Sequence, residues 1–271
     1  MSEYDLDENI DYIKTELKKN WGELNIQFEN SVGSTNEILK EWAYENRVEP
    51  PFLLLAGEQT AGRGRKNRQW YSPKKAGLYF SLLLKPKVNV QKLYLYTIIS
   101  ALAIRESLVS LNYNAEIKWP NDILLGNKKV AGILSKLITF SPNNSKKRNV
   151  VLGIGVNTHI CSFPEDLQCK ATSMLLEKNT SPDLSFFLVD ILKRLANYHR
   201  RLDENDETEE IRKKWMDSLN ITGKVIQVNT GSQTYSGKVQ DISPRGELIL
   251  DTKKGEKTIK AGDVDVNIAQ N

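Results

Sequence analysis

The feature that most constrains the fold is the apolar run Phe52–Ala56, which follows two prolines. A short apolar stretch without polar alternation is typical of a strand that is buried on both faces. Further strands are predicted over 78–84, 117–119, 130–138 and 150–156, and helical periodicity covers 6–20, 91–111 and two stretches of 183–219. This part of the chain is therefore predicted to combine helices with strands.

The pattern of the sequence changes at Gly223. Beyond it, short alternating runs are separated by glycines at near-regular intervals, and this pattern is typical of a small barrel. A length of 271 residues also fits one large domain with a small second one. We therefore predict two domains, residues 1–220 and residues 221–271.

Composition excludes several classes of protein. The formal net charge of +4 arises from 38 basic and 34 acidic side chains, a mild balance that permits anionic ligands and does not demand nucleic acid. The N-terminal segment is acidic and does not have the pattern of a signal peptide. No apolar run is expected to be long enough to span a membrane, so we expect a cytoplasmic protein.

Cysteine and histidine are scarce in this chain. Cys161 and Cys169 are its cysteines, and His159 and His199 are its histidines. The two cysteines could pair, but nothing else marks a disulfide framework, so free thiols are expected. The four residues do not supply a tetrahedral zinc set at ligand spacing.

The densest chemical signal lies in a predicted loop of residues 57–77, which is rich in lysine, arginine and glycine. A stretch this long without secondary structure is usually functional or disordered. Its central glycines permit a close backbone approach, its guanidinium groups suit phosphate or carboxylate oxygens, and its indole could cover a flat ligand. The residues concerned are Gly62, Arg63, Gly64, Arg65, Arg68 and Trp70. A solvated basic loop, or one that touches nucleic acid, is the alternative.

Two further segments place polar or small residues on predicted strands. Lys118–Asp122 follows one strand, so its lysine and its aspartate are expected at one end of the sheet, although its Asn-Asp pair is also common in turns. Gly153 and Gly155 alternate within another strand. Glycines on one face of a strand indicate that a ligand or a packed helix passes close to them.

The segment Ser34–Glu37 has the spacing of a capping box. In that motif the Ser34 hydroxyl accepts a hydrogen bond from an amide of the first helical turn, and Glu37 reaches back toward it. A helix is therefore predicted from this point to about residue 47.

Taken together and in this order, the motifs resemble those of biotin protein ligases. The matching segments are Ser34–Asn36, Gln59, Gly62–Arg65, Arg68, Trp70, Lys118–Asp122, Lys129, Ala131–Leu134 and Gly153–Asn157. The resemblance implies an α/β catalytic domain, with a mixed β-sheet packed with helices as in class II aminoacyl-tRNA synthetases. It also implies a small C-terminal SH3-like β-barrel.

The resemblance further implies a reaction in two steps. The biotin carboxylate attacks the α-phosphate of ATP, which releases pyrophosphate and forms biotinyl-5′-adenylate. A lysine of a biotin carboxyl carrier protein, belonging to acetyl-CoA carboxylase or another biotin-dependent carboxylase, then attacks this anhydride. ATP and biotin are thus substrates, and Mg²⁺ is expected to bind through ATP and not through protein side chains.

The same resemblance assigns site residues. The implied catalytic residues are Arg63, Arg65, Lys118, Asp122 and Lys129. The implied biotin contacts are Ser34, Thr35, Gln59, Gly62, Arg63, Gly132, Gly153 and Gly155. The implied contacts to ATP or the adenylate are Arg65, Arg68, Trp70, Lys118, Asn121, Lys129 and Asn157. Residues 60–72 are expected to close over the adenylate as a lid that excludes water.

The sequence departs from the family pattern in two places. Lys136 follows Ser135 where the family often has an acidic residue, and its charge is expected to repel Lys129 and alter the pKa of that lysine. The C-terminal segment Gly262–Asn267 lacks an arginine that some relatives carry. Whether the C-terminal domain touches the nucleotide is therefore left open by the sequence.

Three other functions compete with this interpretation: a lipoate or octanoate ligase of the same fold, a non-catalytic biotin-adenylate sensor, and a nucleic-acid-binding protein. The arginine–glycine run typical of lipoate ligases does not occur in the sequence, and no RNA-binding aromatic pattern flanks the arginines. The stretch before Ser34 is too short for a winged helix, so no DNA binding is expected. We expect a monomer or a weak homodimer and no membrane partner.

Overall fold

The computed structural model describes residues 6–139, 148–219, 221–243, 245–260 and 262–265. Its helices are α1 (Ile10–Trp21), α2 (Thr35–Tyr44), α3 (Leu95–Ser110), α4 (Met174–Lys178), α5 (Leu184–Asp203) and α6 (Thr208–Leu219). The strands of the larger sheet are β1 (Asn25–Glu29), β2 (Phe52–Ala56), β3 (Gly77–Leu84), β4 (Ala115–Lys118), β5 (Asp122–Leu125), β6 (Lys128–Thr139) and β7 (Arg148–Asn157). The smaller sheet contains β8 (Val225–Asn229), β9 (Thr234–Ile242), β10 (Leu248–Thr252), β11 (Gly255–Ile259) and β12 (Asp263–Asp265).

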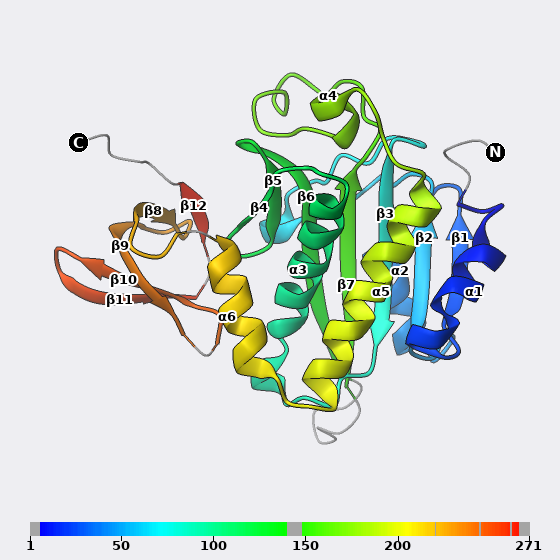
Figure 1. Cartoon of the computed structure of the whole chain (residues 1–271), viewed down its shortest axis with the longest axis horizontal. Coiled ribbons are helices and arrows are strands. Elements are labelled where there is room, and N and C mark those ends of the chain that lie inside the picture. The colour runs from blue at the N-terminus through cyan, green and yellow to red at the C-terminus, as the bar shows by residue number, and fades with distance from the viewer. Residues whose placement is uncertain (1–5, 140–147, 220, 244, 261, 266–271) are drawn as a thin grey trace.

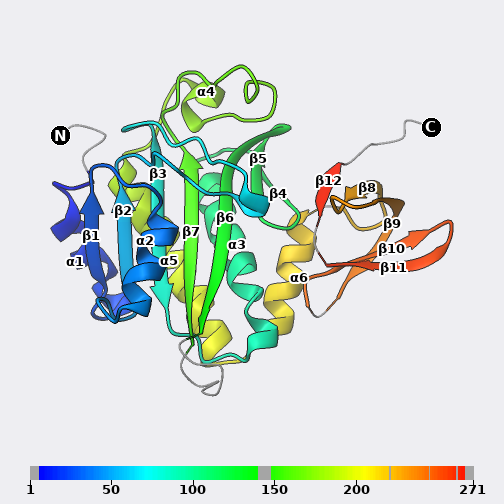
Figure 2. The ribbon, with the colours of Figure 1, turned by 180° about the vertical axis from the view of Figure 1, so that it is seen from behind.

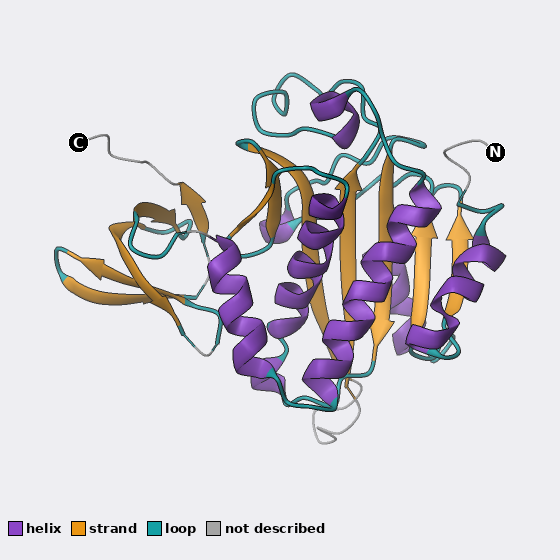
Figure 3. Ribbon diagram, viewed as in Figure 1, coloured by secondary structure: helices purple, strands orange, loops and turns teal. Residues whose placement is uncertain are grey.

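A large mixed sheet forms the centre of the molecule. Its strand order is β1-β2-β3-β7-β6-β5-β4, with β1 and β2 parallel and the other neighbours antiparallel. Helices α1, α3, α5 and α6 cover the face seen in Figure 1, and α2 lies on the opposite face, seen in Figure 2. Figure 3 shows the smaller sheet beside these layers. The predicted combination of a mixed sheet with helices is confirmed.

The central strands are apolar on both faces because helices cover both sides of the sheet. All five residues of β2 are buried, as the apolar run Phe52–Ala56 predicts. Leu152 and Ile154 of β7 pack into the main core on the α3 and α5 side. Val151 of the same strand packs with Leu39 of α2 in a second, smaller core.

The face that α2 covers loses its apolar character toward one end of the sheet. On this face Val151 of β7 is followed by Gly153, Gly155 and Asn157, and Ser81 of β3 pairs with Gly153. Alternate residues of a strand share a face. These small and polar residues therefore form one continuous area next to the first turn of α2.

A β-bulge in β6 changes which residues share this face. The pairing of β5 with β6 passes from Ala131 directly to Lys129, so Val130 is the inserted residue. Val130 and Ala131 are both buried in the main core. The bulge returns Lys129 to the face of Gly132, as bulges near functional sites commonly re-aim a side chain.

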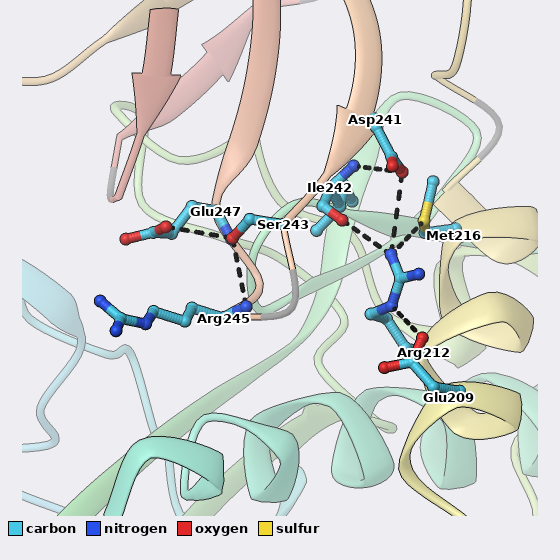
Figure 4. Close-up of polar contacts among 8 residues, drawn as sticks. All are labelled: Glu209, Arg212, Met216, Asp241, Ile242, Ser243, Arg245 and Glu247. Atoms are coloured by element: carbon cyan, nitrogen blue, oxygen red, sulfur yellow. Dashed lines mark hydrogen bonds and ion pairs between the residues drawn. The ribbon is translucent and has the colours of Figure 1, made fainter.

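The smaller sheet is antiparallel throughout, with strand order β11-β10-β9-β8-β12. It is joined to α6 through Arg212, which donates to the Ile242 carbonyl at 2.7 Å and lies 3.7 Å from the Asp241 carboxylate (Figure 4). It is joined to the turn between β4 and β5 through Trp119, whose Nε1 donates to the Gly246 carbonyl at 3.0 Å. The expected small β unit at the C-terminal end is therefore present and docked on the large sheet.

The predicted capping box is wrong. Ser34 has an extended backbone at the start of α2, but its side chain makes no capping hydrogen bond. Glu37 forms an ion pair with Lys136 of β6 and does not reach back to the helix start. A tertiary ion pair has replaced the local interaction that the spacing favoured.

The expectation about apolar runs also needs correction. The segment Val90–Ser110, which includes α3, is long and apolar enough to cross a membrane by composition. Most of it is buried inside the protein, and α3 packs against α5, α6 and the large sheet. The segment is therefore a core helix of this fold.

Candidate active site

A cavity of about 1040 Å³ opens on the face of the large sheet that carries α2. A cavity of this size suits a small-molecule or cofactor site. The residues predicted from the sequence to form a site all line it, with the exception of Gly62: Ser34, Thr35, Gln59, Arg63, Arg65, Arg68, Trp70, Lys118, Asn121, Asp122, Lys129, Gly132, Gly153, Gly155 and Asn157. The structure thus brings together residues that lie far apart in the sequence.

Gly62 lies behind the wall of the cavity. A Cβ at this position would come within 2.5 Å of the Trp70 carbonyl oxygen and 2.9 Å of Ser72 Oγ. The Trp70 amide donates to the Gly62 carbonyl at 2.9 Å. The glycine is therefore needed for the two sides of the loop to approach each other. The residues of the 57–77 loop that have a left-handed backbone are Lys66, Asn67 and Lys75.

A chain of hydrogen bonds joins β3, α2 and the loop at one end of the cavity. The Ser81 hydroxyl donates to Thr35 Oγ1 at 2.8 Å. The Thr35 hydroxyl and amide both donate to Gln59 Oε1, at 3.1 and 3.0 Å, and Gln59 Nε2 donates to Ser72 Oγ at 3.0 Å. The carbonyl oxygen of Gln59 is thus occupied, and one N–H of its amide remains for a ligand.

Asn36 explains why β7 has a glycine at position 153. A Cβ on Gly153 would lie 2.4 Å from Asn36 Nδ2, so only glycine lets this carboxamide rest on the strand. Asn36 Nδ2 donates to the Leu134 carbonyl at 3.0 Å. Asn36 Oδ1 is buried and has no hydrogen-bond partner among the described residues, which leaves an acceptor in the cavity wall.

Trp70 occupies the equivalent position over Gly155. A Cβ on Gly155 would lie 2.4 Å from Trp70 Nε1, and a Cβ on Gly132 would lie 3.2 Å from the same indole. The ammonium of Lys129 lies 4.9 Å from the centre of the Trp70 ring, within the range of a cation–π contact. The alternating glycines of β7 are therefore covered by the Trp70 indole and the Asn36 amide.

Lys129 and Asp122 form an ion pair in the wall of the cavity. Their Nζ and Oδ1 atoms are 2.7 Å apart, and both side chains are about three-quarters shielded from solvent, with exposures of 29% and 27%. The bulge in β6 makes this pair possible, because it turns Lys129 toward the face of Gly132, which pairs with Asp122. A lysine and a carboxylate are thus held together beside the glycine floor.

Arg65 is tied to the turn between β4 and β5. Its Nη1 donates to Asn121 Oδ1 at 2.9 Å. Asn121 in turn donates from Nδ2 to the Ile133 carbonyl at 2.9 Å and accepts from the Ile133 amide through its own carbonyl at 3.0 Å. Asn121 is therefore more than a turn residue, because it fixes a guanidinium from the basic loop against β6.

Much of the remaining wall comes from the segment after β7, residues 158–173, which sequence reasoning missed, and Val264 of β12 in the C-terminal sheet also lines the cavity. Asn157 Nδ2 donates to the Thr172 carbonyl at 3.0 Å, and the Lys129 amide donates to the Lys170 carbonyl at 2.9 Å. Phe163 of this segment lines the cavity and lies 6.1 Å from the Tyr71 ring. The segment carries no motif that would have marked it as part of a site.

The predicted repulsion between Lys136 and Lys129 is not found. Lys136 forms an ion pair with Glu37, and Lys129 pairs with Asp122. The hydrogen bond from Lys136 is the main reason why the pKa of Glu37 is lowered, and Arg63 adds to the effect. The charge of Lys136 is therefore balanced by Glu37 of α2.

Comparison with known proteins agrees with this geometry. Residues 29–157 match the model of the biotin/lipoate A/B protein ligase family, and residues 221–266 match that of the biotin protein ligase C-terminal domain. The biotin–[acetyl-CoA-carboxylase] ligase of Mycobacterium tuberculosis is 30% identical over 90% of this chain and 89% of its own length. The bifunctional ligase/repressor BirA of Bacillus spizizenii is 31% identical over 88% of this chain and 73% of its own length.

A solved structure gives the same result. The biotin protein ligase of Aquifex aeolicus in complex with biotin and ATP has a TM-score of 0.74 and 30% sequence identity, covering 89% of this chain and 97% of that chain. The predicted fold, a biotin ligase catalytic domain followed by a small β unit, is confirmed. On these grounds, and on the site that its residues build, the chain belongs to the biotin protein ligase family.

Proposed function

We propose that this protein activates biotin with ATP and transfers it to a lysine of a biotin carboxyl carrier protein. The observation that carries the proposal is that six cationic residues from four separate segments line one cavity: Arg63, Arg65, Arg68, Lys118, Lys129 and Lys170. The first step joins two anions, a carboxylate and a triphosphate. Positive charge that is already in place offsets their repulsion and stabilises the transition state.

In the first step a carboxylate oxygen of biotin attacks the α-phosphorus of ATP, and the bond to pyrophosphate breaks. Arg63 and Arg65 bind the carboxylate or the α-phosphate, and Arg68 and Lys118 face the departing pyrophosphate. Lys129 binds the oxygen of the acyl-phosphate that forms. A charge-assisted contact of this kind contributes about 1.5–3 kcal/mol. Loss of one that strengthens only in the transition state slows the step on the order of a hundredfold.

Mg²⁺ fits this step as an ion carried by the triphosphate. Asp122 is already paired with Lys129, and the described part of the chain contains no group of three His, Cys, Asp or Glu side chains that could hold a metal. Mg²⁺ is commonly bound through substrate phosphates and few carboxylates. When bound, it would supply further screening of the triphosphate charge.

The biotin ring is proposed to bind next to the hydrogen-bonded chain of Thr35, Gln59 and Ser81. The ureido group of biotin offers one acceptor and two donors. The free N–H of Gln59 suits the ureido oxygen, because the carbonyl oxygen of Gln59 is occupied by Thr35. The hydroxyl of Ser34 and the unpartnered Oδ1 of Asn36 are the acceptors proposed for the ureido N–H groups.

In the second step the lysine amine of the carrier attacks the acyl carbon of the adenylate. The bond from that carbon to the phosphate oxygen breaks, AMP leaves, and the new ammonium loses a proton to become an amide. Asp122 is the proposed acceptor of this proton. It is freed for this role when Lys129 turns from Asp122 to the phosphate.

The loop of residues 60–72 is proposed to act as a lid. Trp70 covers Gly155 and Gly132, so a ligand that uses this floor has to displace the indole or slide beneath it. Lid closure that excludes water would protect the adenylate from hydrolysis. Protease cleavage within the loop is expected to slow when biotin and ATP are added together, and unchanged cleavage would contradict the lid.

The finer properties expected from the sequence stay proposals. They are the division between residues 220 and 221, a cytoplasmic location, a monomer or weak homodimer, and no DNA binding. The comparisons favour neither the lipoate ligase nor the sensor over biotin ligation. A larger rise in melting temperature with lipoate than with biotin, each with ATP, would reverse this choice of substrate.

The test of the whole proposal is transfer of labelled biotin to a carrier domain. Wild-type protein is expected to label the carrier lysine in an ATP-dependent manner, and Arg65→Ala and Lys129→Ala are expected to lose about a hundredfold in rate. Lys74→Ala is the matched control, because this lysine is exposed and does not line the cavity. Full activity in both site variants would discredit the proposed roles.

A further inference from the structure

A second, smaller cavity of about 190 Å³ lies where the C-terminal sheet meets the rest of the protein. Its walls come from α3, β6, α6, the turn between β4 and β5, and the turn between β9 and β10. It shares Arg65 and Asn121 with the large cavity. It is below the size range of sites that hold drug-sized ligands and cofactors, so any ligand has to be small.

All charged residues that line this second cavity, here called the junction cavity, are positive. Arg65, Arg245 and Lys260 line it, and no lining residue is an aspartate or glutamate. In Figure 4 the Arg245 and Glu247 side chains extend to the same side of the turn, and no dashed line joins the Arg245 guanidinium to Glu247. Arg212, in the same view, is balanced by Glu209 at 3.0 Å.

Arg245 and Lys260 differ from Arg212 in having no carboxylate partner among the described residues. Arg245 takes part in a hydrogen bond through its backbone amide, which donates to Ser243 Oγ at 3.1 Å. Arg245 and Lys260 are exposed, and together with Arg65 they give the cavity that they line a positive potential, which attracts anions. Their arrangement therefore favours a bound anion.

The uncharged polar groups of the cavity wall fit the same ligand. Trp215 of α6 is 1% exposed, and its indole N–H has no acceptor among the described residues. An indole nitrogen can only donate, and a buried donor without a partner is costly. Thr97 and Ser135 also line the cavity, and because one of their hydroxyls donates to the other at 2.7 Å, one O–H of this pair is left for a ligand.

We infer that the junction cavity is a binding site for a small inorganic anion of the phosphate class, separate from the nucleotide cavity, in which the C-terminal sheet supplies Arg245 and Lys260. Guanidinium groups are well suited to phosphate oxygens. The anion has two possible sources, free phosphate and the pyrophosphate that the enzyme releases. Because Arg65 belongs to both cavities, pyrophosphate is the source that we propose, and this assignment rests on the proposed function.

The experiment is a calorimetric titration of the full chain with inorganic pyrophosphate and, in a second arm, with orthophosphate. The large cavity is first filled with biotin and a non-hydrolysable analogue of ATP, so that its own cations, including those proposed to face the pyrophosphate, are occupied. Wild-type protein is expected to bind one pyrophosphate under these conditions. The double variant Arg245→Ala/Lys260→Ala is expected to bind it at least about a hundredfold more weakly, because two charge-assisted contacts are lost.

Two further variants serve as controls. Arg245→Lys keeps the charge and is expected to retain most of the affinity. Lys254→Ala removes an exposed lysine of the same sheet that does not line the cavity, and it is expected to bind like the wild type. Equal affinity of the wild type and the double variant, or no pyrophosphate binding with the large cavity filled, would overturn the site.

The two arms separate the sources of the anion. Tighter binding of pyrophosphate than of orthophosphate supports the reaction product as the ligand, and equal binding refutes that assignment. Binding of biotin and the ATP analogue, measured first, reports on the proposed function. If the analogue does not bind, the same variants titrated in the free protein still decide whether the junction cavity holds an anion.

Discussion

Replacement of Gly155 by alanine tests the contact between Trp70 and the strand beneath it. The added Cβ would lie 2.4 Å from Trp70 Nε1 and 2.7 Å from Cε2, both inside van der Waals contact. Gly155 does not have a positive φ, so the backbone accepts alanine and the cost arises from this contact. Overpacking of this kind typically costs about 1–3 kcal/mol. We expect Gly155→Ala to lower the free energy of unfolding by about that amount.

The assay is urea unfolding followed by circular dichroism, in the wild-type background and in a Trp70→Ala background. Removal of the indole removes the clash, so the cost of Gly155→Ala should fall below about 0.5 kcal/mol there. Gly33→Ala is the matched control, because a Cβ at Gly33 meets no atom within 4 Å. An equal cost of Gly155→Ala in both backgrounds would refute the packing of Trp70 on this strand.

Three further predictions concern stability and catalysis. Burial lowers the pKa of His199 below the usual histidine value of about 6.5, so at acidic pH the unfolded chain binds more protons than the folded protein. Stability should therefore fall as the pH falls from about 7 to 5. Thermal unfolding across this pH range should show a smaller fall in His199→Gln. Asp122→Asn should slow biotin transfer on the order of tenfold or more and pyrophosphate release much less, and equal slowing of both steps would contradict its role with the carrier lysine. Trp119→Phe loses the bond to the Gly246 carbonyl and should cost about 0.5–1.5 kcal/mol in urea unfolding, whereas no change would mean that this contact contributes nothing.

The elements of the large sheet were predictable because their signals are local. Phe52–Ala56 is apolar at every position and is a fully buried strand. The two helices predicted within 183–219 are α5 and α6. In each of these segments the local pattern of apolar residues is enough to predict the type of element, and the tertiary contacts agree with it.

The contacts of the site could not be predicted because they join residues that are distant in sequence. The sequence marks Gly153 and Gly155 as points of close approach, but it does not say that Asn36 and Trp70 are the groups that approach. The insertion of Val130 in β6, which re-aims Lys129, depends on the pairing with β5. Such pairings are set by the assembled sheet and leave no local pattern.

Ser81 was not predicted to belong to the site, but the sequence around it indicates a buried polar group. Ser81 stands between apolar residues in a strand that is buried at every position, and a buried hydroxyl has to find a hydrogen-bond partner. Its partner is Thr35, which holds Gln59. A serine inside an apolar run was therefore sufficient to indicate a polar network on that face.

The turn between β4 and β5 links the chemistry of the cavity to the C-terminal sheet. Within it, Trp119 binds the Gly246 carbonyl, and two residues later Asn121 binds Arg65. A shift of the C-terminal sheet would therefore move the turn that positions a guanidinium of the large cavity. Since Arg65 also lines the junction cavity, an anion bound there would act on the same side chain. The C-terminal sheet is thus expected to affect the rate of biotin activation even if no part of it touches biotin or the nucleotide.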